Sequence, residues 1–257
     1  QRQMCIRDRY RRYQSFCKNF SGNELYKIAC GPNSNDYNWT DVVMSNLGEW
    51  HTKAISLHYY TVPTGDWNKK GSATEFSDEE YYETISKTLY MDELIKRHSE
   101  IMSRRDPEGK IGLIVDEWGC WYDVEEGTNP GFLYQQNTMR DAMVAALSLN
   151  TFHNYADRVK MANIAQIANV LQAMVLTKDD KMVLTPSYYV FKMYIPHQGA
   201  KLIPLTVNTT YRQTSDKRLV PVVSATASEK DGKVTVSLVN TDLKEECDVA
   251  IPLGSIK

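Results

Sequence analysis

The sequence lacks several features that would each assign it to a class of protein. Its five cysteines are odd in number, show no CxxC spacing and have no histidine partners at metal-ligand intervals. We therefore expect reduced thiols that pack inside the fold, no bound metal and a cytoplasmic location. No run of about 18 uncharged apolar residues occurs, so we expect no membrane-spanning helix and no membrane partner.

The sequence also lacks an excess of charge of either sign and several well-known catalytic motifs. The formal net charge is −2 and acidic and basic residues are interspersed, so nothing electrostatic favours nucleic acid as a partner. The sequence contains no GxSxG motif and no Walker loop, which leaves nucleophilic-serine and phosphoryl-transfer mechanisms without support. A neutral or small substrate is the expectation that remains.

Strand and helix patterns alternate between residues 10 and 197. Apolar residues spaced three and four apart from Tyr10 predict a helix that lies on a core and ends at the turn 21–23. Predicted strands cover 25–31, 54–60 and 111–117. Predicted helices cover 36–47, 77–105 and 133–149, and another begins at Thr185-Pro186. A strand-like apolar run covers 162–171. Apolar strands that alternate with helices predict a parallel α/β sheet or barrel.

The two ends of the chain differ from this pattern. Residues 1–9 show no amphipathic period, and we interpret them as a non-native remnant outside the fold. Beyond residue 198, the segment 219–242 contains two β-rich runs joined by a turn at Lys230-Asp231-Gly232, and 247–253 is a third run. Residues 198–257 are therefore predicted to form a separate antiparallel module.

Catalytic groups of a parallel barrel lie at the carboxyl ends of its strands. Glu117 ends the predicted strand 111–117, in the sequence DEWGCW, and is a candidate catalytic carboxylate. Asp116 precedes it, and strand alternation predicts that its side chain points the other way, in a structural role. Glu24 stands in a Gly-Asn-Glu sequence that resembles a glycosidase acid, but it lies before its strand, and we interpret it as a turn residue.

Four other side chains are candidates for ligand contacts. His58 and Tyr60 end the predicted strand 54–60, where they could bond a sugar or a nucleophile, although ordinary core positions explain them equally well. Gln166 is polar within an apolar run, so as a buried amide it would need backbone or ligand partners. Trp121 could stack on a sugar face or anchor its loop. Asn169, His153 and His197 are interpreted as satisfied structural residues.

Four segments together resemble the family 51 glycoside hydrolases, the α-L-arabinofuranosidases. They are residues 21–44, 56–61, 112–153 and 157–174, and the resemblance extends over nearly all of the chain from Tyr10. It implies a retaining enzyme that needs no cofactor and acts on arabinose-containing oligo- or polysaccharides. It also implies a (β/α)8 TIM barrel beside a β-sandwich. Relatives can be hexameric, so the resemblance allows a homo-oligomer in the full-length enzyme without deciding it.

The resemblance also assigns roles to single residues. Glu117 matches the nucleophile of the family's Asp-Glu-Trp motif, His58 and Tyr60 match residues that contact the nucleophile and the sugar, and Trp121 and Gln166 resemble residues that line the arabinose pocket. The family's acid/base glutamate precedes the helix that begins near Tyr10, so the resemblance places it outside this chain.

On this basis residues 10–197 are expected to form a partial barrel, about strands five to eight, and 198–257 an incomplete β-sandwich, in a chain that is inactive or nearly so alone. Two alternatives remain open. The chain could belong to another retaining barrel glycosidase, a xylosidase or an endoglucanase, that uses the same Glu117. It could also be a non-catalytic carbohydrate-binding or structural module.

Overall fold

The computed structural model describes the backbone of residues 2–252 and the side chains of residues 8–252. Its main feature is a four-stranded parallel sheet in which the strands follow the order β1-β2-β3-β4. The strands are β1 (Ile28–Ala29), β2 (Ala54–Thr61), β3 (Gly112–Cys120) and β4 (Val159–Ile164). Their alternation with helices confirms the predicted parallel α/β organisation.

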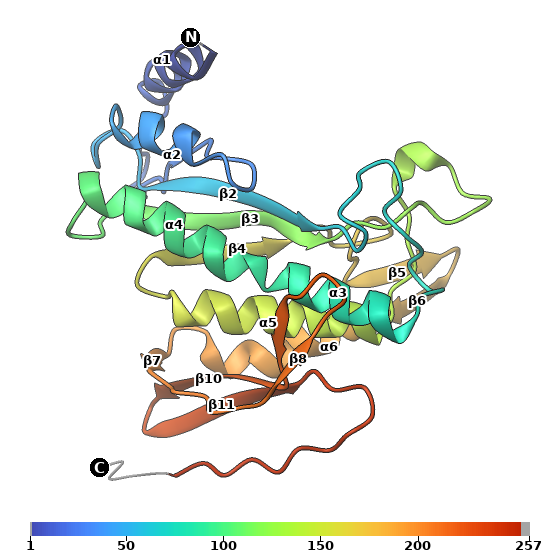
Figure 1. The fold of residues 1–257 in the computed structure, drawn as a ribbon. Helices are drawn as coiled ribbons and strands as arrows, with labels where there is room; N and C mark the ends of the chain where they lie inside the picture. Colours follow the sequence, from blue (N-terminus) through green and yellow to red (C-terminus); the bar gives the residue numbers. More distant parts are fainter. Residues whose placement is uncertain (1, 253–257) are drawn as a thin grey trace.

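Helices connect these strands, and α4 and α5 lie along one side of the sheet (Figure 1). The helices between the strands and after them are α2 (Tyr37–Met44), α3 (Asp78–Thr88), α4 (Tyr90–Arg105), α5 (Met139–Asn154) and α6 (Pro186–Tyr194). α5 contacts β3 and β4 as well as α6, so it joins the sheet to the rest of the molecule.

β3 is the centre of the core. Leu113, Ile114 and Val115 are fully buried, which confirms the prediction of a strand that is apolar on both faces. Trp118, farther along β3, is also buried and packs against Phe152 of α5, with ring centroids 5.1 Å apart. These contacts fix the strand on both sides of Glu117.

Hydroxyl groups determine where the helices begin and where one of them divides. Ser77 caps α3 in the predicted capping box with Glu80. The single helix predicted over 77–105 is divided at Leu89 into α3 and α4, because Thr84 and Thr88 donate hydroxyl hydrogen bonds to the carbonyls four residues earlier and so distort the turn. Thr185 caps α6 as predicted, with Pro186 at its first position.

Three predicted elements begin or end elsewhere. α5 begins at Met139 instead of residue 133, because Thr138 forms a capping box with Asp141. The strand-like run 162–171 is only partly a strand, since β4 ends at Ile164 and a loop follows. β1 has two residues where 25–31 was predicted, and among the described residues it pairs with β2 alone.

The first helix differs most from the prediction. α1 (Arg2–Gln14) runs across residue 9 and ends earlier than the turn at 21–23. Tyr13, Phe16 and Phe20 of the predicted apolar stripe are 69%, 74% and 75% exposed, so the expectation that they lie on a core is wrong. Spacing alone defines a helix face but does not supply a partner for it. Tyr10 does reach the body, where its hydroxyl donates to the His51 carbonyl at 3.0 Å.

The C-terminal part forms antiparallel sheets next to α5 and α6 (Figure 1). β10 (Val223–Lys230) and β11 (Lys233–Asn240) make the predicted hairpin, and both residues of its turn, Asp231 and Gly232, have positive φ. The third strand of this sheet is β7 (Lys201–Ile203), and β8 (Tyr211–Gln213) with β9 (Leu219–Pro221) forms a small hairpin. Another small hairpin, of β5 (Val175–Lys178) and β6 (Lys181–Leu184), precedes α6 and lies apart from this sheet.

The third β-run predicted at 247–253 is wrong over its described part. Residues 247–252 contain no strand, and residue 253 lies outside the described residues. Val249 and Ile251 instead line a hollow of about 640 Å³ beside β10 and β11. Apolar residues alternate here because one side of the segment faces the hollow, and the backbone does not pair with a strand.

The cysteines also correct an expectation. Cys120 is buried, but Cys17, Cys30 and Cys247 are exposed, and the side chain of Cys5 lies outside the described ones. All four described thiols are free. Within residues 2–252, none of the helices combines the length and the apolar composition needed to cross a membrane.

Candidate active site

Residues from β2 and β3 converge toward the carboxyl edge of the sheet. The parallel register pairs His58 with Glu117 and Tyr60 with Gly119. The Tyr60 hydroxyl donates to Oε1 of Glu117 at 2.7 Å, and Nδ1 of His58 lies 2.9 Å from Oε2. Both oxygens of the Glu117 carboxylate are therefore contacted by residues that the sequence singled out.

Asp116 joins this cluster, so the prediction that it points the other way is wrong. Its Oδ1 lies 3.1 Å from Nε2 of His58, which places two consecutive acidic residues against one imidazole. The reason is an irregular register: the pairing of β2 with β3 shifts between Ser56 and His58, and that of β3 with β4 shifts between Val115 and Trp118. A bulge suspends the alternation of side chains that a regular strand would impose.

Tyr60 remains a hydrogen-bond donor. Burial, followed by the hydrogen bond to Glu117 and the charge of that carboxylate, raises the pKa of Tyr60 above its ordinary value. The phenol therefore stays protonated at neutral pH. The acidic and imidazole groups are open to solvent, since the side chains of Glu117 and His58 are 39% and 40% exposed.

Aromatic residues continue from Tyr60 into the neighbouring loops. Trp121 stands edge-on to Tyr60, with ring centroids 4.9 Å apart, and Trp67 stands edge-on to Trp121 at 5.4 Å. The sequence prediction included Trp121 but missed Trp67. The signal for Trp67 was its position in a polar, glycine-containing loop directly after the strand that carries His58 and Tyr60.

Open space adjoins the cluster. A hollow of about 610 Å³ is lined by His58 and Asp116 on one side and by Gly31, Pro32 and Asn33, which follow β1, on the other. Among the described residues no group of three His, Cys, Asp or Glu side chains could hold a metal ion. The chemistry available here is that of carboxylate, imidazole and phenol.

Gln166 occupies a different environment from the predicted one. It is exposed, so the expectation of a buried amide is wrong. It follows β4 at the carboxyl edge, where the Ala165 amide donates to the Trp118 carbonyl at 3.0 Å. Gln166 thus lies on the same edge of the sheet as Glu117. Its assignment to an arabinose pocket stays a prediction.

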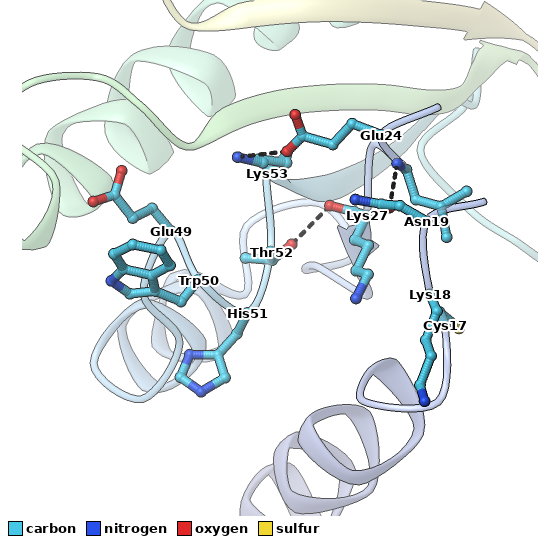
Figure 2. Close-up of a pocket in the computed structure, with 11 residues that line it drawn as sticks. Cys17, Lys18, Asn19, Glu24, Lys27, Glu49, Trp50, His51, Thr52 and Lys53 are labelled. Atoms are coloured by element: carbon cyan, nitrogen blue, oxygen red, sulfur yellow. Dashed lines mark hydrogen bonds and ion pairs between the residues drawn. The ribbon is translucent and has the colours of Figure 1, made fainter. Parts of the chain in front are cut away.

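Glu24 lies at the other edge of the sheet. Its Oε1 forms an ion pair with Nζ of Lys53 at 3.2 Å, and Lys53 immediately precedes β2. Figure 2 shows Glu24 and Lys53 on the wall of a separate hollow of about 400 Å³, which Trp50 and His51 also line. Strand direction therefore separates Glu24 from Glu117.

The three residues interpreted as structural behave in two ways. Asn169 bonds to Thr177, and His197 lies 2.7 Å from the Ser228 hydroxyl and 2.9 Å from that of Ser237. His153 is different, because its buried Nδ1 has no hydrogen-bond partner among the described residues. Burial, and then the neighbouring His197, lower the pKa of His153 to about 4, so its ring is neutral.

Comparison with known proteins identifies the family. The sequence model of the alpha-L-arabinofuranosidase C-terminal domain matches residues 116–254, which is more than half of the chain. The chain belongs to the family 51 α-L-arabinofuranosidases. This confirms the resemblance that the motifs indicated.

Similar proteins support the family assignment along the whole chain. The chain is 53% identical over 251 residues to an intracellular exo-alpha-L-arabinofuranosidase of Bacteroides ovatus, a match that covers 97% of this chain and 48% of the relative. It is 25% identical to the intracellular exo-alpha-(1->5)-L-arabinofuranosidase 1 of Bacillus subtilis strain 168, over 83% of this chain and 43% of that protein.

A solved structure shows the same arrangement of elements. The GH51 arabinofuranosidase of Xanthomonas axonopodis pv. citri is 48% identical, with a TM-score of 0.90, and the match covers 94% of this chain and 49% of that one. The chain therefore spans about half the length of the arabinofuranosidases that it matches.

Proposed function

We propose that this chain is the part of a retaining α-L-arabinofuranosidase that carries the nucleophile. The complete enzyme removes terminal arabinofuranosyl units from arabinose-containing oligo- or polysaccharides. The observation that carries the proposal is the Glu117 carboxylate, held between Tyr60 and His58 near the carboxyl edge of a parallel sheet in a chain of this family.

The proposed chemistry begins at Glu117. One carboxylate oxygen attacks the anomeric carbon, a bond from carbon to Glu117 forms, and the glycosidic bond breaks with its electron pair on the departing oxygen. Tyr60 and His58 fix the direction of the carboxylate. Water then hydrolyses the glycosyl ester and releases arabinose with its configuration retained.

The departing oxygen needs a proton from a second carboxyl, which in retaining glycosidases lies about 5 Å from the first. Asp116 is engaged with the far nitrogen of His58, and Glu24 pairs with Lys53 at the other edge of the sheet. Neither is therefore assigned the acid role. We place the acid/base glutamate outside these 257 residues.

The rest of the proposal concerns the complete enzyme. β1 to β4, within residues 10–197, serve as strands five to eight of a (β/α)8 barrel, and residues 198–257 form part of a β-sandwich beside it. The enzyme needs no cofactor and works in the cytoplasm. The chain alone turns over ordinary substrates slowly or not at all, since general acid assistance is worth about 10² to 10⁴ in rate.

The substrate class is tested with leaving groups that need no proton. The substrates are dinitrophenyl glycosides of α-L-arabinofuranose, β-xylose and β-glucose. Their leaving group departs as the stable dinitrophenolate anion, so the chain can react without an acid to protonate it. We expect dinitrophenolate release from the arabinofuranoside alone, and none from Glu117→Gln. Preferred reaction with the xyloside or glucoside would indicate another retaining glycosidase, and equal release by wild type and Glu117→Gln would indicate a non-catalytic module.

A further inference from the structure

Trp67 is the outermost member of a row of rings that begins at the nucleophile. Tyr60 donates to Glu117, Trp121 stands edge-on to Tyr60, and Trp67 stands edge-on to Trp121 at an interplanar angle of 82°. Trp67 is 53% exposed, so a large part of its ring faces solvent. The row leads from the reacting carboxylate toward solvent.

The loop that carries Trp67 is held in place from two sides. The Asp123 carboxylate accepts hydrogen bonds from the amides of Lys70 and Gly71 at 3.1 and 3.0 Å, and the Asp123 amide donates to the Gly71 carbonyl at 2.9 Å. Within the loop, Asp66 accepts from the Asn68 amide at 2.8 Å. Asp123 thereby joins the loop after β2 to the loop after β3, and the two tryptophans keep a fixed spacing.

A positioned and exposed indole matches a particular ligand chemistry. The C–H face of a sugar ring is apolar and packs on an aromatic face, while its hydroxyls remain in water. Nζ of Lys70 lies 5.9 Å from the centroid of the Trp121 ring, so a hydrogen-bond donor is present beside the aromatic row. A neutral saccharide chain fits this combination.

We propose that Trp67 is the platform for the sugar unit on the leaving-group side of the bond that is cleaved. The inference rests on the proposed function, which places the anomeric carbon of the released unit against Glu117. The next unit of the chain must then extend away from Glu117, and Trp67 lies farther along the aromatic row than Trp121. Trp67 selects oligosaccharides over free arabinose and takes no part in the bond changes.

The test compares two ligands and three variants of the full chain. Dissociation constants for L-arabinose and for α-1,5-linked arabinotriose are measured by ligand-observed NMR with wild type, Trp67→Ala and Trp67→Phe. Trp50→Ala is the matched control, because Trp50 is 88% exposed and lines the hollow at the opposite edge of the sheet. Thermal unfolding of each variant verifies that it is folded.

We expect Trp67→Ala to weaken arabinotriose binding about tenfold and to leave arabinose binding unchanged, because one stacked ring is lost. Trp67→Phe retains most of the affinity, and Trp50→Ala changes neither ligand. Equal weakening of both ligands, no change for either, or a wild-type chain that binds neither overturns the inference.

The platform and the proposed function fail in different ways. The chain could react with the dinitrophenyl arabinofuranoside at Glu117 and bind arabinotriose equally well with and without Trp67. That result would support the proposed function and refute the role of Trp67. The chain could instead show the Trp67-dependent affinity without any reaction at Glu117. That result would support sugar binding at Trp67 and refute the proposed function.

Discussion

Nδ1 of His58 lies 2.9 Å from Oε2 of Glu117, across the register-paired strands β2 and β3. The other ring nitrogen faces Asp116 at 3.1 Å, so the imidazole is held from both sides by residues adjacent in sequence. We infer that Asp116 positions His58, and through His58 positions Glu117.

Asp116→Ala is expected to slow the reaction of Glu117 with dinitrophenyl arabinofuranoside about tenfold, because His58 loses the carboxylate that lies 3.1 Å from its Nε2. Asp116→Asn, which keeps an acceptor oxygen in place, should recover part of the rate. Stopped-flow release of dinitrophenolate measures both variants. Glu24→Ala is the control, and an equal loss in that variant would contradict a local role for Asp116.

Tyr60→Phe is expected to slow the same reaction by at least about tenfold, since Oε1 of Glu117 loses the donor that fixes it. The ring contact with Trp121 persists, so the free energy of unfolding should change by no more than about 1 kcal/mol. Kinetics and urea unfolding on the same preparation separate the two effects. A folded variant with an unchanged rate would remove Tyr60 from the site.

The buried pair of Arg158 and Asp106 is expected to stabilise the sheet that positions the site. Nη1 of Arg158 donates to Oδ2 of Asp106 at 2.7 Å and to the Ile111 carbonyl at 2.9 Å, which ties the end of α4 to the start of β3. Asp106→Ala should reduce the free energy of unfolding by about 3 to 5 kcal/mol, because the guanidinium is left buried and unpaired.

Glu108→Ala provides the control for that pair. Glu108 forms an ion pair with Lys110 at 2.9 Å on the surface, so its loss should cost about 1 kcal/mol or less. Urea unfolding of both variants makes the comparison. A similar effect of the two substitutions would show that the buried pair has no special structural role.

His153 is expected to make the stability depend on pH. Its folded-state pKa, about 4, lies below the ordinary value of 6.5, so the stabilisation is complete above pH 6.5 and is lost as the pH falls through 4. Between pH 7 and pH 4, the free energy of unfolding of His153→Gln should fall by about 2 kcal/mol less than that of wild type. Urea unfolding at several pH values between 7 and 4 measures it, and parallel curves for the two proteins would contradict the prediction.

Strand positions in the sequence indicated which side chains of β2 and β3 lie near one another. Residues 54–60 and 111–117 read as buried strands, and parallel strands bring their carboxyl ends together, so Glu117, His58 and Tyr60 meet as their positions indicate. Asp116 could not be placed in this way, because the register shift that turns it toward His58 leaves no mark on the alternation of residues.

The other errors arise where apolar residues have no partner that the sequence reveals. Gln166 sits in an apolar run that reads as a buried strand, but β4 ends at Ile164 and the Gln166 amide donates to the Leu171 carbonyl within the loop that follows. Tyr13 and Phe16 form a helical stripe that is exposed in the structure. Trp67 was missed because its neighbours in the fold, Trp121 and Asp123, lie more than fifty residues away in the chain.

The site of covalent attachment tests the central claim most directly. The 257-residue chain is mixed with dinitrophenyl α-L-arabinofuranoside, quenched in acid, digested and mapped by mass spectrometry. The account predicts one arabinofuranosyl ester, on Glu117, and its disappearance in Glu117→Gln. A folded chain that remains unlabelled, or one that carries the label on another carboxylate, would contradict the assignment of Glu117 as the nucleophile.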